Sequence, residues 1–178
     1  MKRRTVFAAV AVLALSAAAT SEAGAASRGG FGRVTLRGVG PLRFGSSTPS
    51  DLRRFAGRPD GSNSVDGGDS NGTSYSAKIL FYNSPDHGFT SYYFVNPDGA
   101  WVFDGFESTL QRFHTAHGTK AGMSVGAAEK REKIGRTSTF CIGPALLRKG
   151  QGALLGVVIS RSRVSDLFAI GPYPFGFC

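Results

Sequence analysis

Apolar and polar residues alternate in short runs along most of the chain after residue 74. The runs at 75–82, 89–95 and 100–106 are rich in aromatic and β-branched residues, and the turn sequences NSPDHG and NPDG separate them. This pattern predicts three antiparallel strands in a meander. Further runs at 137–147, 152–160 and 163–170, separated by RKGQ and RSR, predict a second meander.

A short helix is predicted before each meander. Thr48 is a capping residue, Pro49 suits the first helical position, and Asp51 follows three residues after the cap, so a helix should begin at 49 and end at Gly57. The second helix should lie within 122–135, capped by Ser124 and ended by Gly135. Residues 33–37 and 110–115 read as extended, and the Gly/Ser/Asp/Asn-rich stretch 57–74 reads as a surface loop.

The order of strand, helix and meander therefore occurs twice. We expect an α+β fold of two tandem repeats, each a short helix packed on a three- to four-stranded antiparallel meander. The first repeat would span residues 27–108 and the second 109–178. The two helical stretches align at their flanking glycines if one residue is inserted.

Residues 1–26 have the features of a secretory signal peptide. Three basic residues precede a short apolar run, and small residues around 23–26 provide a cleavage site. The apolar run is too short for a stable membrane anchor, and no later segment is apolar enough to span a bilayer. We expect a secreted, extracellular protein.

The chain is strongly basic, with a formal net charge of +9. Cleavage after residue 26 would leave 18 basic and 11 acidic residues, a net charge of +7. Seven arginines lie between Arg28 and Arg58, with Asp51 as the only acid among them. Such a surface favours anionic partners, either a cell-surface polymer or an acidic extracellular protein; a nucleic acid partner is less expected. A solvated basic surface without a ligand is the alternative.

The chain has two cysteines, Cys141 and Cys178. An even number of cysteines in an exported chain favours a disulfide between them. Such a bond would attach the residues near the C-terminus to the rest of the chain. Metal binding would need more cysteine or histidine around them, and no metal site or cofactor is expected.

The helix entries LRFGSSTPSDLRRFAGRPD and HGTKAGMSVGAAEKREKIG carry a resemblance to known families. They resemble the helix entry of the secreted β-lactamase inhibitory proteins, which are tandem helix-plus-sheet repeats, and of the small outer-membrane assembly lipoproteins. The chain is also similar to exported actinobacterial proteins with a GxGPLRxG segment. This resemblance implies a doubled helix-plus-sheet fold with a concave sheet surface, and an inhibitor-like binding function.

Few residues suggest chemistry. Residues 122–126 match the G-x-S-x-G pattern of a serine nucleophile, which leaves a small extracellular hydrolase using Ser124 as an alternative function, although a helix-capping serine is the simpler interpretation. The side chains of His114 and His117 should point in different directions, so we do not expect them to bind one metal ion together. Asp104 and Glu107 are expected to be ordinary solvated acids at the end of a strand.

The aromatic residues of the first meander give the clearest candidate for a binding surface. Strand alternation places one set on a shared face, namely Lys78, Tyr82, Tyr92 and, with ambiguous parity, Trp101. In a doubled helix-plus-sheet module we expect this face to be the one that the helix leaves open. Tyrosines are common anchors of protein interfaces. The alternative is that other parts of the chain cover this face. We therefore expect a secreted, non-enzymatic binding or interaction protein.

Overall fold

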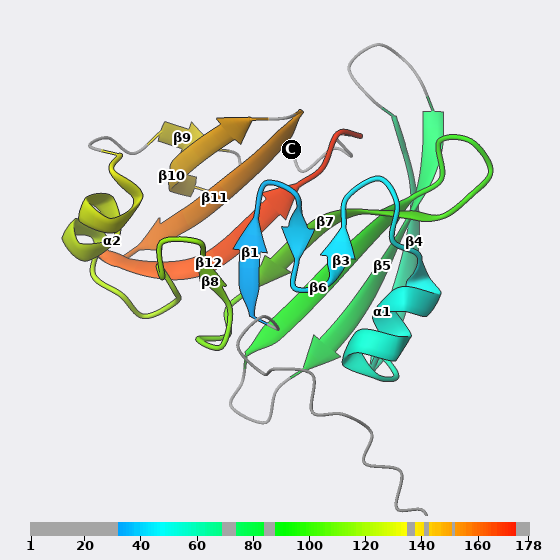
Figure 1. Cartoon of the computed structure of the whole chain (residues 1–178), viewed down its shortest axis with the longest axis horizontal. Helices are drawn as coiled ribbons and strands as arrows, with labels where there is room; N and C mark the ends of the chain where they lie inside the picture. The colour runs from blue at the N-terminus through cyan, green and yellow to red at the C-terminus, as the bar shows by residue number, and fades with distance from the viewer. Residues whose placement is uncertain are drawn as a thin grey trace, which may run out of the picture.

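The computed structural model describes residues 32–68, 74–83, 88–134, 138–140, 143–150 and 152–173. These residues form mostly β-structure in two sheets, with two short helices, α1 (Pro49–Ala56) and α2 (Val125–Glu132) (Figure 1). The expected combination of antiparallel strands and two short helices is confirmed at this level.

The large sheet is antiparallel and has eight strands, in the spatial order β4-β5-β6-β7-β12-β11-β10-β9. One half contains β4 (Gly61–Gly68), β5 (Ser74–Asn83), β6 (Phe89–Val95) and β7 (Val102–Ser108). The other half contains β9 (Ser138–Phe140), β10 (Gly143–Gly150), β11 (Ala153–Ser160) and β12 (Arg163–Ile170). The halves join where β7 pairs with β12, from Ser108 opposite Leu167 to Gly105 opposite Ile170.

A small sheet of four short strands has the order β3-β2-β1-β8. It contains β1 (Arg33–Thr35), β2 (Gly38–Val39), β3 (Leu42–Arg43) and β8 (His114–Thr115), and β1 pairs in parallel with β8. The reversal between β1 and β2 requires glycine at 38, where φ is 145° and a Cβ would lie 1.9 Å from the Leu42 carbonyl oxygen.

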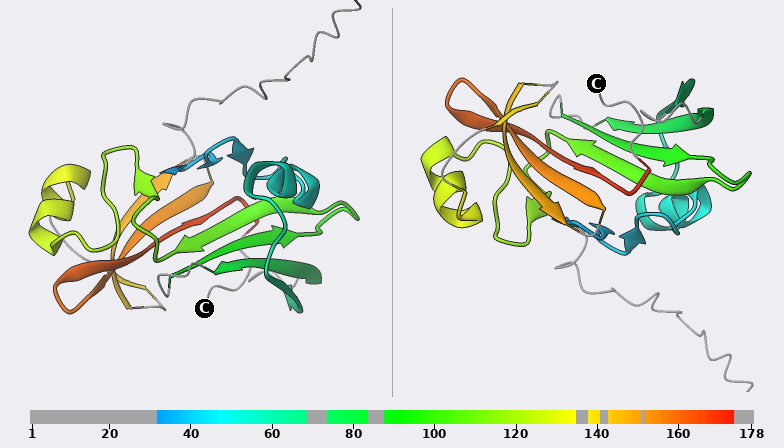
Figure 2. Two further views of the ribbon diagram at one scale, coloured as in Figure 1. Left: turned by 90° about the horizontal axis from the view of Figure 1, so that it is seen from below. Right: turned by 90° about the horizontal axis from the view of Figure 1, so that it is seen from above.

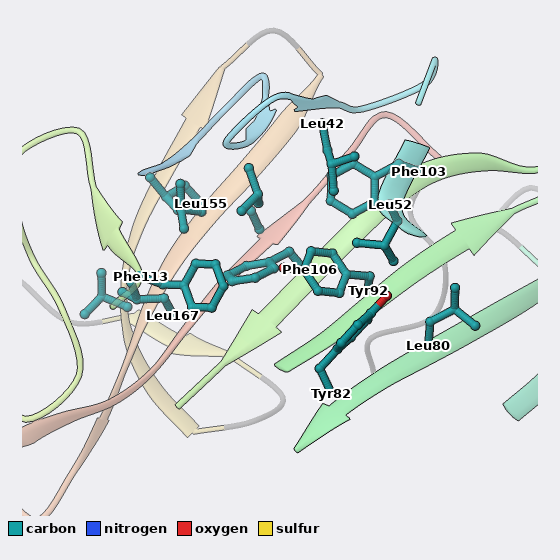
Figure 3. Packing of buried hydrophobic residues seen from close by; sticks show 14 of the residues in the cluster. Leu42, Leu52, Leu80, Tyr82, Tyr92, Phe103, Phe106, Phe113, Leu155 and Leu167 are labelled. Atoms are coloured by element: carbon teal, nitrogen blue, oxygen red, sulfur yellow. The ribbon is translucent and has the colours of Figure 1, made fainter. Parts of the chain in front are cut away.

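The two helices and the small sheet pack on the same face of the large sheet, which we call the inner face (Figure 2). Apolar side chains from both helices and both sheets form one buried cluster, part of which is seen in Figure 3. Its largest fully buried side chains are Tyr92, Phe94, Phe103, Phe106, Leu42, Leu52, Leu80, Leu146 and Leu167. Removal of this apolar surface from water is the main stabilising contribution to the fold.

Helix α1 begins and ends as the sequence predicts. The Thr48 hydroxyl accepts a hydrogen bond from the Asp51 N–H, and the Asp51 carboxylate accepts one from the Thr48 N–H, which is a complete capping box. Leu52 is buried against the sheet, and Gly57 ends the helix with φ 84°.

Three expectations about individual elements are wrong. Residues 61–68 form strand β4 rather than loop, because antiparallel pairing with β5 satisfies their backbone even though their small polar side chains favour strands weakly. The expected strand at 137–147 is instead two strands, β9 and β10, paired antiparallel. Helix α2 ends at Glu132, before Gly135, because Lys133 adopts a left-handed conformation.

No helix in the described ranges has both the length and the apolar character needed to cross a membrane.

Candidate functional site

The four residues predicted as a binding surface all come from the first predicted repeat, residues 27–108, and the structure brings them together in two pairs. The Lys78 Nζ lies 4.8 Å from the centre of the Trp101 ring, and both side chains are half-buried. Tyr82 and Tyr92 meet edge to face, with ring centres 5.5 Å apart.

The tyrosine pair does not project from an open face. Tyr92 is 2% exposed and Tyr82 is 9% exposed, and both belong to the buried cluster with Leu52 of α1 (Figure 3). The face that we expected to be open is thus the one that the helix covers. Alternation fixes which residues share a face, but it does not identify the face on which a helix packs. Whether any of the four contacts a ligand stays a prediction.

A hollow lined by several arginines lies elsewhere, beside the small sheet. It has a volume of about 550 Å³. We call it the arginine groove; its lining is mostly basic or small, and consists of Arg33, Thr35, Leu36, Arg37, Gly40, Arg43, Ala116, His117, Arg148 and Leu155.

Two consecutive reversals of the chain build one wall of the groove. Between Arg33 and Arg43 the apolar residues Val34, Val39 and Leu42 are buried, which leaves the arginines exposed. The Gly40 N–H donates to the Arg33 carbonyl at 2.9 Å, so the first reversal returns the chain beside β1, and the second places β3 beside β2. The Arg43 Nη1 donates to the Gly40 carbonyl at 2.9 Å, which restrains that guanidinium at the wall.

Arg148 from β10 supplies the opposite wall. Its Nη2 donates to the Glu132 carbonyl at 2.7 Å and lies 3.3 Å from the Glu132 Oε2. The Nε of Arg148 is buried and has no hydrogen-bond partner among the described residues. A buried donor without a partner costs free energy, which an anion in the groove would recover.

Glu132 also fixes the loop that carries His117. Its Oε1 accepts a hydrogen bond from the Thr115 hydroxyl at 2.5 Å, and the same hydroxyl oxygen accepts the N–H groups of His117 and Thr119. One buried carboxylate therefore links Arg148 to the loop that carries His117.

The groove has an excess of positive charge. Four arginines line it, and Glu132 is the carboxylate that pairs with one of them, Arg148. No acidic residue is found among the described lining residues, and within the described ranges neither Arg33 nor Arg43 forms an ion pair. Guanidinium groups match carboxylate and phosphate in geometry as well as in charge. In the sequence, the cluster of arginines between Arg28 and Arg58 indicates this site. The sequence does not show that Arg148 lies beside them.

Ser124 lies at the N-cap position of α2, as expected, and is exposed, but its side chain makes no capping hydrogen bond. In the described part of the chain no histidine or acid hydrogen-bonds to its hydroxyl. The hydrolase alternative remains a prediction, which labelling with a fluorophosphonate would test.

The two histidines of the 114–117 stretch have separate surroundings. The Nδ1 of His114 lies 2.9 Å from the Thr115 carbonyl oxygen, whereas His117 lines the arginine groove. Among the described residues, no group of three or more histidine, cysteine or acidic side chains could hold a metal ion.

Asp104 is not the solvated acid that the sequence suggested, because it is 1% exposed. It is the extra residue of a bulge in β7, between Phe103 opposite Phe94 and Gly105 opposite Tyr93. Its Oδ1 accepts the Tyr173 N–H at 3.1 Å, and burial raises the pKa of its carboxyl to about 8. Burial also raises the pKa of Glu107, whose carboxylate accepts a hydrogen bond from the Tyr93 hydroxyl.

The predicted disulfide between Cys141 and Cys178 lies outside the described residues. No family model, curated protein or solved structure matches the chain.

Proposed function

We propose that this chain is an exported, non-enzymatic binding protein whose partner is an anionic polymer of the cell surface. The observation that carries the proposal is the convergence of Arg33, Arg37 and Arg43 with Arg148 in one groove. These residues come from the N-terminal strands and from β10, which are more than a hundred residues apart in the chain.

The chemistry of the groove supports a polymer with repeated negative charges. A single small anion would satisfy one or two guanidinium groups, whereas a chain of phosphates or carboxylates would meet several at once. Because neither Arg33 nor Arg43 has a carboxylate partner among the described residues, binding would not require an existing ion pair to break. The net charge of +7 that remains after cleavage at residue 26 would also attract such a polymer over a longer range.

We propose further that residues 27–108 and 109–178 are two copies of one module. Support comes from the order of elements, because each part contains one helix followed by four antiparallel strands. The last strands of the two parts, β7 and β12, meet in the middle of the large sheet. This arrangement agrees with the resemblance to tandem-repeat inhibitors.

Export is part of the proposal and rests on the signal-peptide pattern of residues 1–26. The N-terminal sequence of the protein recovered from a culture supernatant should begin close to Ala26 or Ser27. Its intact mass should be 2 Da lower than that of the reduced chain if Cys141 is bonded to Cys178, as one S–S bond replaces two S–H bonds at a loss of about 2 Da. Recovery of the protein with residues 1–26 attached would contradict export.

The groove can be tested with long-chain inorganic polyphosphate as the probe, titrated into residues 27–178 at several salt concentrations. The double variant Arg33→Gln, Arg43→Gln should bind at least about 10-fold more weakly, with a salt slope reduced by about 0.7–0.9 for each lost contact, the value known for nucleic acid phosphates.

The matched control is Arg53→Gln, Arg161→Gln, which removes the same charge from exposed sites outside the groove. It should bind within about 3-fold of the unmodified protein, because only long-range attraction is reduced. Equal weakening in both double variants would show that net charge alone attracts the polymer, and the proposed groove would be rejected.

A further inference from the structure

A second hollow lies where strands β1 and β8 begin, between the end of α1 and strands β5 and β6. It has a volume of about 370 Å³, and we call it the aromatic pocket. Four aromatic side chains line it, Phe55, Tyr82, Tyr92 and Phe113, together with Ala56 and Arg112. Pockets for small organic ligands are typically of this size and are mainly apolar with a few polar groups.

The aromatic walls belong to the rigid part of the molecule. Tyr92 packs edge to face on Tyr82 and Phe106, at 5.5 Å in each case, and Phe106 in turn contacts Phe113 at 4.8 Å. The Tyr82 hydroxyl donates to the Gly57 carbonyl at 3.0 Å, which leaves its oxygen able to accept a hydrogen bond. Tyr92 is only 2% exposed, and the part of it that stays accessible lines the aromatic pocket.

Positive charge is concentrated near the tyrosine hydroxyls. The Arg112 guanidinium lies 5.2 Å from the centre of the Phe113 ring, so it is held at the edge of the pocket. Burial raises the pKa of Tyr92 and the charge of Arg112 opposes this rise; at Tyr82 burial is again the main cause, opposed by Arg53 and reinforced by Asp60. Among the described lining residues, Arg112 is the charged side chain of the pocket.

We propose that the aromatic pocket binds a small carboxylic acid with an aromatic ring or a short branched alkyl chain. The apolar part of the ligand lies among Phe55, Tyr82 and Phe113, and the carboxylate lies at Arg112, where the Tyr92 hydroxyl can donate to it. This site is separate from the arginine groove, and its existence does not depend on the polymer proposed above.

The competing occupant is the chain itself. Gly32, the first described residue, also lines the pocket, and the residue before it is Phe31. An aromatic side chain so close in sequence has the chemistry to enter the same site. The test must therefore distinguish a bound acid from Phe31.

The probe is 3-phenylpropionate, titrated calorimetrically into residues 27–178, with 3-phenylpropionamide as its neutral counterpart. The unmodified protein should bind the acid at least 10-fold more tightly than the amide. Arg112→Gln should remove this preference and leave the amide affinity within about 2-fold. Arg161→Gln, an exposed arginine outside the pocket, should keep the preference.

Ala56→Leu fills the pocket from the exposed end of α1 without altering a buried residue, so it should weaken both probes at least 10-fold while leaving the thermal unfolding transition cooperative. Three outcomes would overturn the proposal: equal affinity for acid and amide, unchanged binding in Ala56→Leu, or binding of the acid only after Phe31→Ala, which would identify Phe31 as the occupant. None of these outcomes bears on polyphosphate binding by the arginine groove.

Discussion

The guanidinium of Arg148 and the carboxylate of Glu132 form an ion pair at 3.3 Å in which the acid is 3% exposed and the arginine is partly accessible. The pair joins β10 to the end of α2, and through Thr115 it also holds the loop that leads from β8.

Loss of the arginine should therefore cost more stability than neutralisation of the acid. Arg148→Gln leaves a buried carboxylate without its counter-charge, and we expect a loss of about 2–3 kcal/mol in the free energy of unfolding. Glu132→Gln keeps a side chain that can accept from Thr115, and we expect about half that loss. Urea denaturation of both variants measures the difference; equal losses would contradict a role for charge in this contact.

The two helix N-termini give a matched pair of substitutions. Thr48→Ala removes a side-chain cap that α1 uses, and it should reduce stability by about 1 kcal/mol. Ser124→Ala occupies the same position at α2 but removes no capping hydrogen bond, so its effect should be within about 0.3 kcal/mol of zero. Thermal unfolding of the two variants is the measurement, and a larger loss for Ser124→Ala would show that this serine does cap its helix.

Asp104 should make the protein less stable as the pH rises. The pKa of its carboxyl is about 8 in the folded chain, against 3.8 as the ordinary value, so the folded chain binds this proton more tightly than the unfolded chain does. The resulting stabilisation is complete below about pH 4 and is lost progressively up to about pH 8. Glu107, whose pKa is also raised, acts in the same direction.

The variant Asp104→Asn separates these contributions. Asparagine can still accept the Tyr173 N–H but cannot ionise, so the melting temperature should depend less on pH between 5 and 8. A pH profile parallel to that of the unmodified protein would contradict a raised pKa at Asp104.

Two glycines should respond to alanine in opposite directions. At Gly156 in β11, a Cβ would lie 1.9 Å from the Phe168 ring, so Gly156→Ala should displace a buried ring and cost about 2–3 kcal/mol. At Gly126 in α2, a Cβ would meet nothing within 4 Å, so Gly126→Ala should stabilise by about 0.5–1 kcal/mol. Chemical denaturation of both variants tests the pair; a harmless Gly156→Ala would mean that Phe168 has room to move.

The sequence predicts an element well where its formation depends only on neighbouring residues. Strands 89–95 and 163–170 appear with the expected bounds, and α1 has the expected cap and end, because alternation, capping chemistry and terminal glycine depend on neighbouring residues. Strand β4 was missed because it depends on its partner strand: Ser62, Asn63 and Ser64 have little strand preference of their own.

The candidate sites were harder to predict because they depend on pairing between distant segments. The parity of Tyr82 and Tyr92 was correct, but the packing of Leu52 decided that their face is covered. Similarly, the arginines near the N-terminus were visible as a charged cluster, whereas Arg148 joins them only through the packing of β10 beneath the small sheet.

The pairing of β7 with β12 has a consequence for how the molecule forms. The chain is synthesised from its N-terminus, so β7 is complete before β12, the last strand of the described residues. The edge of β7 therefore has no partner until residues 163–170 have been made. An unpaired strand edge can pair with a second copy instead. Shortened chains that end before β12 should therefore self-associate.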